Sequence, residues 1–306
     1  MLLTKNYKVM GDILPFLFNG LSISSILLLT SIGLSIVFGM MGVINFAHGE
    51  FIMIGCYSSY IVSLVLGNEG TWFTLLIAFF LSFILSFGIG FLVEKFIIKR
   101  LYARPLDSIL ATWGVSLILQ QLARNIFGSN NVNAPMPKIL NTGWKVSEDI
   151  TLPYNRILII FISLLLCLFV YYFMYKTPKG RILQSVMQNR SMAACIGINT
   201  KKADSFAFSF GCGLAGIAGI CISMLGSIGP STGQNYIIDT FLVVILGGIG
   251  GLRGSVLGAL LIGMSSPFIE SITSSSMAKV IILCLVLITL QYKPQGLSPM
   301  KDRTID

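Results

Sequence analysis

The stretch VINFAHGEFIMIG, residues 43–55, holds the only histidine of the chain, His48. Long apolar runs lie on both sides of this polar interruption, at residues 13–38 and 51–66. Further runs of the same kind are found at residues 73–93, 106–127, 156–175 and 205–225, and more lie near the C-terminus. Because about 20 mostly apolar residues span the hydrocarbon core as a helix, the sequence predicts an all-α, polytopic transmembrane helical bundle. We expect about eight to ten spans, some of them broken helices, in a single domain over residues 1–306.

The composition agrees with a membrane protein. Hydrophobic residues make up 55% of the chain and charged residues only 11%, whereas a soluble domain has about 25% charged residues. The formal net charge of +9 comes from lysines and arginines that cluster between the apolar runs. That distribution is typical of a membrane protein and does not indicate a nucleic-acid partner.

The basic clusters predict the orientation in the membrane. They lie at residues 95–104, 176–202 and 293–303, which the positive-inside rule places in the cytoplasm. Segment 128–155 balances its charges and segment 226–239 has no lysine or arginine, so both are expected outside. Counting crossings gives an external N-terminus and a cytoplasmic C-terminus, although two lysines near the N-terminus do not fit.

Segment 177–203 predicts an amphipathic helix on the cytoplasmic side, because its apolar residues recur at helical spacing with basic residues between them. One interpretation is a docking surface for a soluble partner. The other is a helix that lies passively at the membrane interface through its basic face.

Two windows of the sequence resemble each other. Aligned without gaps, residues 36–55 and 244–263 share four identities, among them Gly42 with Gly250. The pattern fits either a duplication, with parallel repeats, or coincidence. Paired interruptions in corresponding halves are typical of the pathway of a transporter.

The interruption itself carries Asn45, His48 and Glu50. Lipid cannot satisfy the polar backbone of a broken helix, so these residues are not expected to face lipid. They form either part of a pathway or gate, or a short cytoplasmic turn between two spans. Other polar residues in or near spans are candidates for the pathway or for hydrogen bonds that hold helices together: Thr112, Gln120, Gln121, Gln234 and Asp239.

Catalytic and metal sites are not predicted. One histidine without a second suitably spaced ligand makes neither a zinc site nor a Ser/His/Asp triad. The sequence has no Gly-Lys pair and hence no phosphate-binding loop of the G-x-x-x-x-G-K-[ST] type. No cofactor is expected in this chain, and any ATP that drives transport is expected on another chain.

Several stretches carry a family resemblance: FGMMGVINFAHGEFIMIG, RPLDSILATWGVSLILQQ, LPYNR, QNRSMAACIGINTKKADSFAF and GPSTGQNYIIDTFLVVILGGIGGLRGSVLGALLIG. Together they resemble the permease of bacterial ABC importers of the branched-chain amino acid class, and most closely the urea branch. The resemblance implies a multi-pass protein of the inner membrane with four partners: a second homologous permease, two cytoplasmic ATPases and an extracytoplasmic solute-binding protein. It also implies a coupling helix at residues 188–198 that rests on an ATPase, with the matching residues Gln188, Asn189, Ala193, Gly197 and Ile198.

Urea is the substrate that the resemblance favours. A neutral solute also fits the absence of lysine and arginine from deep positions in the first six apolar runs. The alternatives are a permease for branched-chain amino acids, a stand-alone channel or secondary transporter, and an intramembrane enzyme for which catalytic groups are lacking.

Overall fold

The computed structural model describes residues 2–67, 70–101, 104–145 and 151–298. The long helices are α1 (Leu2–Met41), α2 (His48–Val65), α3 (Trp72–Phe96), α4 (Pro105–Phe127), α5 (Tyr154–Lys176), α8 (Thr200–Ser223), α9 (Thr232–Gly247), α10 (Leu252–Ile272) and α11 (Ser275–Tyr292). The short elements are η1 (Ile98–Arg100), η2 (Lys138–Asn141), β1 (Gly143–Lys145), β2 (Thr151–Pro153), α6 (Pro178–Gln188) and α7 (Arg190–Cys195). The prediction of an all-α, polytopic membrane protein is confirmed.

Seven of the described helices are long and apolar enough to cross a membrane: α1, α3, α4, α5, α8, α10 and α11. The two other long helices, α2 and α9, follow polar segments and start with polar residues of their own. These two helices account for the difference from the larger number of spans expected from the sequence.

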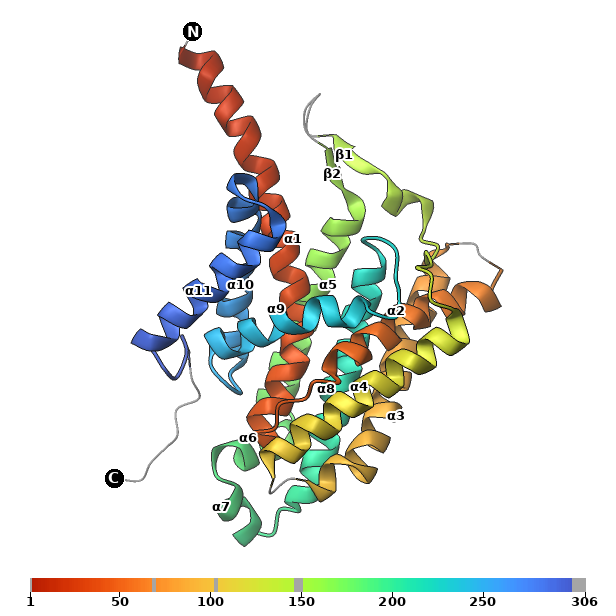
Figure 1. Cartoon of the computed structure of the whole chain (residues 1–306), viewed down its shortest axis with the longest axis vertical. Helices are drawn as coiled ribbons and strands as arrows, with labels where there is room; N and C mark the ends of the chain where they lie inside the picture. The colour runs from red at the N-terminus through yellow and green to blue at the C-terminus, as the bar shows by residue number, and fades with distance from the viewer. Residues whose placement is uncertain (1, 68–69, 102–103, 146–150, 299–306) are drawn as a thin grey trace.

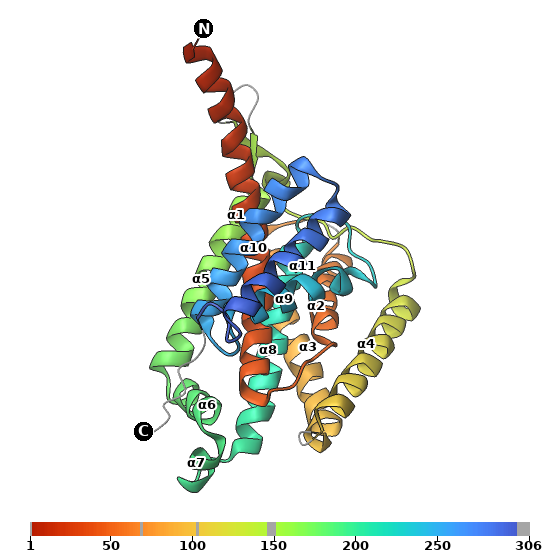
Figure 2. The ribbon, with the colours of Figure 1, turned by 60° about the vertical axis from the view of Figure 1, so that its left-hand side comes forward.

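Helix α8 forms the centre of the bundle, with α1, α2 and α3 packed around it (Figures 1 and 2). Small residues allow α2 and α8 to approach backbone to backbone. A Cβ atom on Gly55 would lie 2.0 Å from the carbonyl oxygen of Gly216, and one on Gly219 would lie 2.1 Å from that of Ile52. Helix α10 packs along α1, and α11 lies outside α10 and α9.

The two ends of the bundle differ. The N-terminal end of α1 and the hairpin of β1 and β2 lie at one end, whereas α6 and α7 lie at the other (Figure 1). The predicted external loop 128–155 therefore shares its end with the N-terminus, opposite the predicted coupling segment 177–203. Residues 146–150 of that loop are outside the described residues. Which end faces the cytoplasm stays a prediction from the distribution of lysine and arginine.

Candidate functional site

The polar interruption between α1 and α2 lies inside the bundle. Nε2–H of His48, the first residue of α2, donates a hydrogen bond of 3.1 Å to the carbonyl oxygen of Thr30. Thr30 precedes Met41, the end of α1, by 11 residues, which is about 16 Å of helix. The chain therefore turns back after α1, with Gly42 at a φ of 62°, and α2 begins deep in the bundle. Asn45 and His48 are fully buried, whereas Gly42 and Phe46 of the same segment are exposed, so the polar side chains of the break face the interior of the bundle.

Glu50 connects this break to α4. Its carboxylate is buried in the first turn of α2, where a negative charge is favourable to the helix dipole. Oε1 accepts hydrogen bonds from Ser116 Oγ at 2.9 Å and Gln120 Nε2 at 2.8 Å, while Oε2 has no such partner among the described residues. One turn earlier on α4, Thr112 Oγ1 accepts a bond of 3.2 Å from the amide of Phe46. The network holds α4 against α2, and its role in a pathway stays a prediction.

The remaining predicted polar residues do not join this network. Gln121 is exposed, and its Nε2 donates to Asn125 Oδ1 of its own helix at 3.1 Å. Gln234 is exposed near the start of α9. Asp239, farther along α9, lines a cavity described next.

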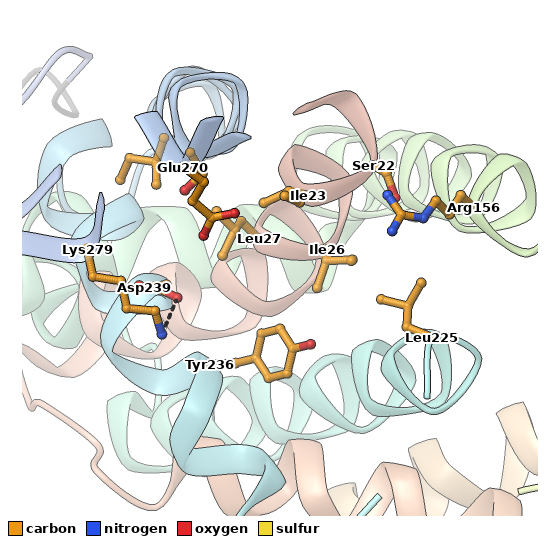
Figure 3. Close-up of a pocket in the computed structure, with 12 residues that line it drawn as sticks. Ser22, Ile23, Ile26, Leu27, Arg156, Leu225, Tyr236, Asp239, Glu270 and Lys279 are labelled. Carbon is orange, nitrogen blue, oxygen red and sulfur yellow. Dashed lines mark ion pairs between the residues drawn. The ribbon is translucent and has the colours of Figure 1, made fainter. Parts of the chain in front are cut away.

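A cavity of about 240 Å³ lies between α1, α5, α9, α10 and α11 (Figure 3). Ile23, Ile26 and Leu27 of α1 form much of its apolar wall, together with Leu225 beyond the end of α8. Ser22 also lines it, and the buried Ser22 Oγ has no hydrogen-bond partner in the described part of the chain. A buried hydroxyl without a partner is costly, so this wall is suited to a polar ligand atom or water.

Charged side chains lie at opposite ends of the cavity. Arg156, near the start of α5, lies on one side, where its Nη1 donates to Asn19 Oδ1. Asp239, Glu270 and Lys279 lie across from it, as Figure 3 shows. Asp239 Oδ2 and Lys279 Nζ are 3.7 Å apart. The cavity therefore offers a guanidinium at one end, two carboxylates and the Lys279 ammonium that pairs with one of them at the other, and an apolar wall between them.

Of these four charged residues, only Asp239 was a candidate from the sequence. Arg156 opens an apolar run, and Glu270 and Lys279 lie in the C-terminal part, where individual runs were not delimited. The signal that could have identified them is the presence of ionisable residues within or at the ends of apolar helices, because such residues indicate a functional site by default. The prediction of a neutral solute did not take into account that charged residues from several helices line one cavity.

The predicted coupling segment is two helices and not one. Gln188 ends α6, and the extended Asn189 caps the start of α7 with its side chain. Ala193 is the buried residue of α7, and Gly197, at a φ of 87°, turns the chain toward Ile198 and α8. The apolar periodicity of this segment predicts one continuous helix, and the backbone conformations of Asn189 and Gly197 interrupt that helix.

Three of the predicted coupling residues, Gln188, Asn189 and Gly197, are exposed on this segment, whereas Ala193 is buried and Ile198 is partly buried. Met192 and Ile196 are 55% and 68% exposed, and the partly exposed Arg190 pairs with the buried Asp204. Met192 on α7 and Ile196 directly after it are exposed apolar residues beside the predicted ones, and they are further candidates for docking.

The two aligned windows meet in the structure. Gly42 and Gly250 both have positive φ, at 62° and 77°, and each belongs to the break after a helix. A Cβ on Gly39 would lie 2.4 Å from the Cα of Gly250, so the two breaks pack together. The helices before them differ, with 40 residues in α1 and 16 in α9. The similarity is local, and duplication stays a hypothesis.

Comparisons with known proteins agree over almost the whole chain. The family described as "Branched-chain amino acid transport system / permease component" matches residues 16–290. The high-affinity branched-chain amino acid transport system permease protein LivH of Salmonella typhimurium is 28% identical over 292 residues, which cover 92% of this chain and 94% of LivH. BraD of Pseudomonas aeruginosa, of the same description, is 28% identical over 290 residues, with 92% and 94% covered.

A second type of relative is LivM of Escherichia coli, a high-affinity branched-chain amino acid transport system permease protein like LivH of that organism. It is 24% identical over 302 residues, which cover 91% of this chain and 69% of LivM. No solved structure matches the chain. The names of these relatives specify branched-chain amino acids and none mentions urea, so the comparisons favour the alternative substrate.

Proposed function

The chain belongs to the family of branched-chain amino acid transport system permease components, and we propose that it carries branched-chain amino acids as one permease subunit of an ABC importer. The observation that carries the substrate assignment is the cavity between α1, α5, α9, α10 and α11, with opposite charges at its two ends and an apolar wall.

A branched-chain amino acid has three parts to recognise: a carboxylate, an ammonium group and an aliphatic side chain. The guanidinium of Arg156 suits the carboxylate, because its planar donors match two carboxylate oxygens. Glu270, together with Asp239, which already pairs with Lys279, suits the ammonium group at the opposite end. Ile23, Ile26 and Leu27 supply apolar surface for the side chain, and such mixed walls are typical of small-molecule sites.

Urea fits this cavity less well. It is neutral, so it offers nothing to compensate the charges of Arg156 and Glu270 when the cavity closes to water, and desolvating unpaired charges is expensive. A zwitterion supplies both counter-charges at once.

The proposed importer contains the partners of the sequence prediction: a second homologous permease, two ATPases and a solute-binding protein. The similarity to both LivH and LivM supports a paired permease core. We assign ATPase contact to the capped α6–α7 segment, through the exposed Met192 and Ile196.

Uptake of labelled leucine and labelled urea by cells that carry the complete transporter tests the proposal. We expect leucine uptake that depends on this chain and on the ATPases. Arg156→Leu should lower leucine uptake at least about tenfold, since loss of one charge-assisted interaction costs about 1.5–3 kcal/mol. The matched control is Lys138→Gln, which removes an exposed cation in the external loop and should leave uptake unchanged.

Other outcomes are decisive as well. Uptake of urea that leucine does not inhibit would overturn the substrate assignment and leave the family membership standing. Leucine uptake that persists without the ATPases would identify a channel or secondary transporter. Normal uptake by Arg156→Leu would remove the cavity from the pathway.

A further inference from the structure

A groove of about 510 Å³ runs between α3 and α8 at the end of the bundle that carries α6 and α7. It is separate from the charged cavity described above and shares none of its residues. Its walls are of two kinds. Phe87, Phe91 and Phe206 form an aromatic wall within the membrane-spanning part, and four lysines gather at one end.

The four lysines are Lys95 and Lys99 from the end of α3 and η1, and Lys201 and Lys202 from the first turn of α8. All four are exposed, and none forms an ion pair with another residue that the structure describes. Lys95 Nζ lies 5.8 Å from the centre of the Phe91 ring. Four like charges that line one groove without an acidic partner among the described residues repel one another, so an anion in the groove would be stabilising.

The nearby acidic groups do not supply that anion. Glu94 is fully buried and accepts a hydrogen bond from Ser205, and Asp204 is fully buried and paired with Arg190. Both carboxylates are turned into the protein, whereas the lysines project outward. The groove itself therefore has a strongly positive end.

The depth of the two walls matches an amphiphile. Phe87 precedes Lys95 by eight residues on α3, which is about 12 Å along the helix axis. The lysines therefore lie at the end of a span, near the level of lipid headgroups, while the phenylalanines lie at the level of acyl chains. This end is also the one that the lysine and arginine distribution predicts to be cytoplasmic, where the leaflet is anionic.

We propose that this groove binds one anionic phospholipid, with its phosphate at Lys95, Lys99, Lys201 and Lys202 and an acyl chain against Phe87, Phe91 and Phe206. A free phosphate would satisfy only the lysines and leave the aromatic wall uncovered. Basic pockets between transmembrane helices on the cytoplasmic side are suited to such headgroups.

The test is lipid binding by the purified full chain in neutral detergent, measured by native mass spectrometry with phosphatidylglycerol and with phosphatidylcholine. We expect phosphatidylglycerol to bind preferentially. Lys99→Gln with Lys201→Gln should weaken phosphatidylglycerol binding about 25-fold, at about fivefold per lysine. The matched control is Lys138→Gln with Lys145→Gln, two exposed lysines at the opposite end of the molecule, which should leave binding unchanged.

Phe91→Ser should weaken binding of the long-chain lipid while the lysines remain in place. Equal binding of phosphatidylcholine, or equal loss in the control pair, would overturn the proposal. Displacement of the lipid by millimolar inorganic phosphate would identify a phosphate site. Release of the lipid by added ATPase subunits, with loss of ATPase binding in Lys99→Gln with Lys201→Gln, would identify a protein dock and would also overturn it.

Discussion

The buried network of Glu50 supports a quantitative prediction about how α4 is held in the bundle. Glu50 accepts two hydrogen bonds from α4, from Ser116 at 2.9 Å and Gln120 at 2.8 Å. Hydrogen bonds between transmembrane helices contribute about 0.6 kcal/mol on average and up to about 1.7 kcal/mol each. Glu50→Ala should therefore lower the free energy of unfolding by about 1–3 kcal/mol.

A double-mutant cycle isolates one of these bonds. Glu50→Ala and Gln120→Ala, made singly and together, should show a coupling of about 0.6–1.7 kcal/mol in the free energy of unfolding in bicelles. The matched control is Gln121→Ala. Gln121 follows Gln120 directly but is exposed and bonded to Asn125 of its own helix, so its coupling to Glu50 should be close to zero.

Equal coupling of Glu50 to Gln120 and to Gln121, or no coupling to either, would contradict this role of the network. The network would then not hold α4, and the burial of the carboxylate would need a different cause. Glu50→Gln adds a second comparison, because the amide oxygen can still accept both bonds. We expect it to be more stable than Glu50→Ala.

Three further predictions concern backbone packing and docking. Gly55→Ala should destabilise the protein by about 1–3 kcal/mol or prevent folding, because its Cβ would clash with the backbone of Gly216. Gly88→Ala, in open space on α3, should instead stabilise the protein by up to about 1 kcal/mol. The free energies of unfolding distinguish the two variants, and equal effects would contradict the packing of α2 on α8. Gly42→Ala should cost about 1–2 kcal/mol and Gly42→Asn less, since asparagine tolerates positive φ better; an equal cost would mean that the turn relaxes. Met192→Glu should weaken binding of the ATPase to the purified permease at least about tenfold without loss of insertion, and unchanged binding would exclude this face as the dock.

The spans were predictable because each is a statement about composition over about 20 residues. The expected runs 106–127 and 156–175 lie within one or two residues of α4 and α5. The break after α1 was also predictable, since polar residues and glycine interrupt two apolar runs. Its depth was not, because depth depends on where the chain turns back, and only the contact of His48 with Thr30 shows that.

The sequence also could not show which of two adjacent polar residues on α4 contacts α2. Gln120 and Gln121 differ by about 100° around α4, so only one of them can face α2. The apolar residues of α4 could face either lipid or the interior of the bundle, since both are apolar environments. In a membrane protein the hydrophobic pattern therefore identifies helices well and orients them poorly. The charged cavity is harder still to predict, because it depends on the relative positions of five helices.

The proposed docking segment and the proposed substrate cavity are joined by one rigid element. Helix α5 has 23 residues, about 35 Å, with Arg156 near one end and Lys176 at the other. Helix α6 follows directly and is locked to α5, because a Cβ on Gly180 would lie 2.1 Å from the carbonyl oxygen of Phe173. Thr177 Oγ1 adds a hydrogen bond to that same carbonyl oxygen at 2.6 Å.

A displacement of α6 and α7 by an ATPase would thus move α5 as a rod, and Arg156 with it. Since Asp239 and Glu270 stand on α9 and α10, such a movement would separate the two charged ends of the cavity and release a bound zwitterion.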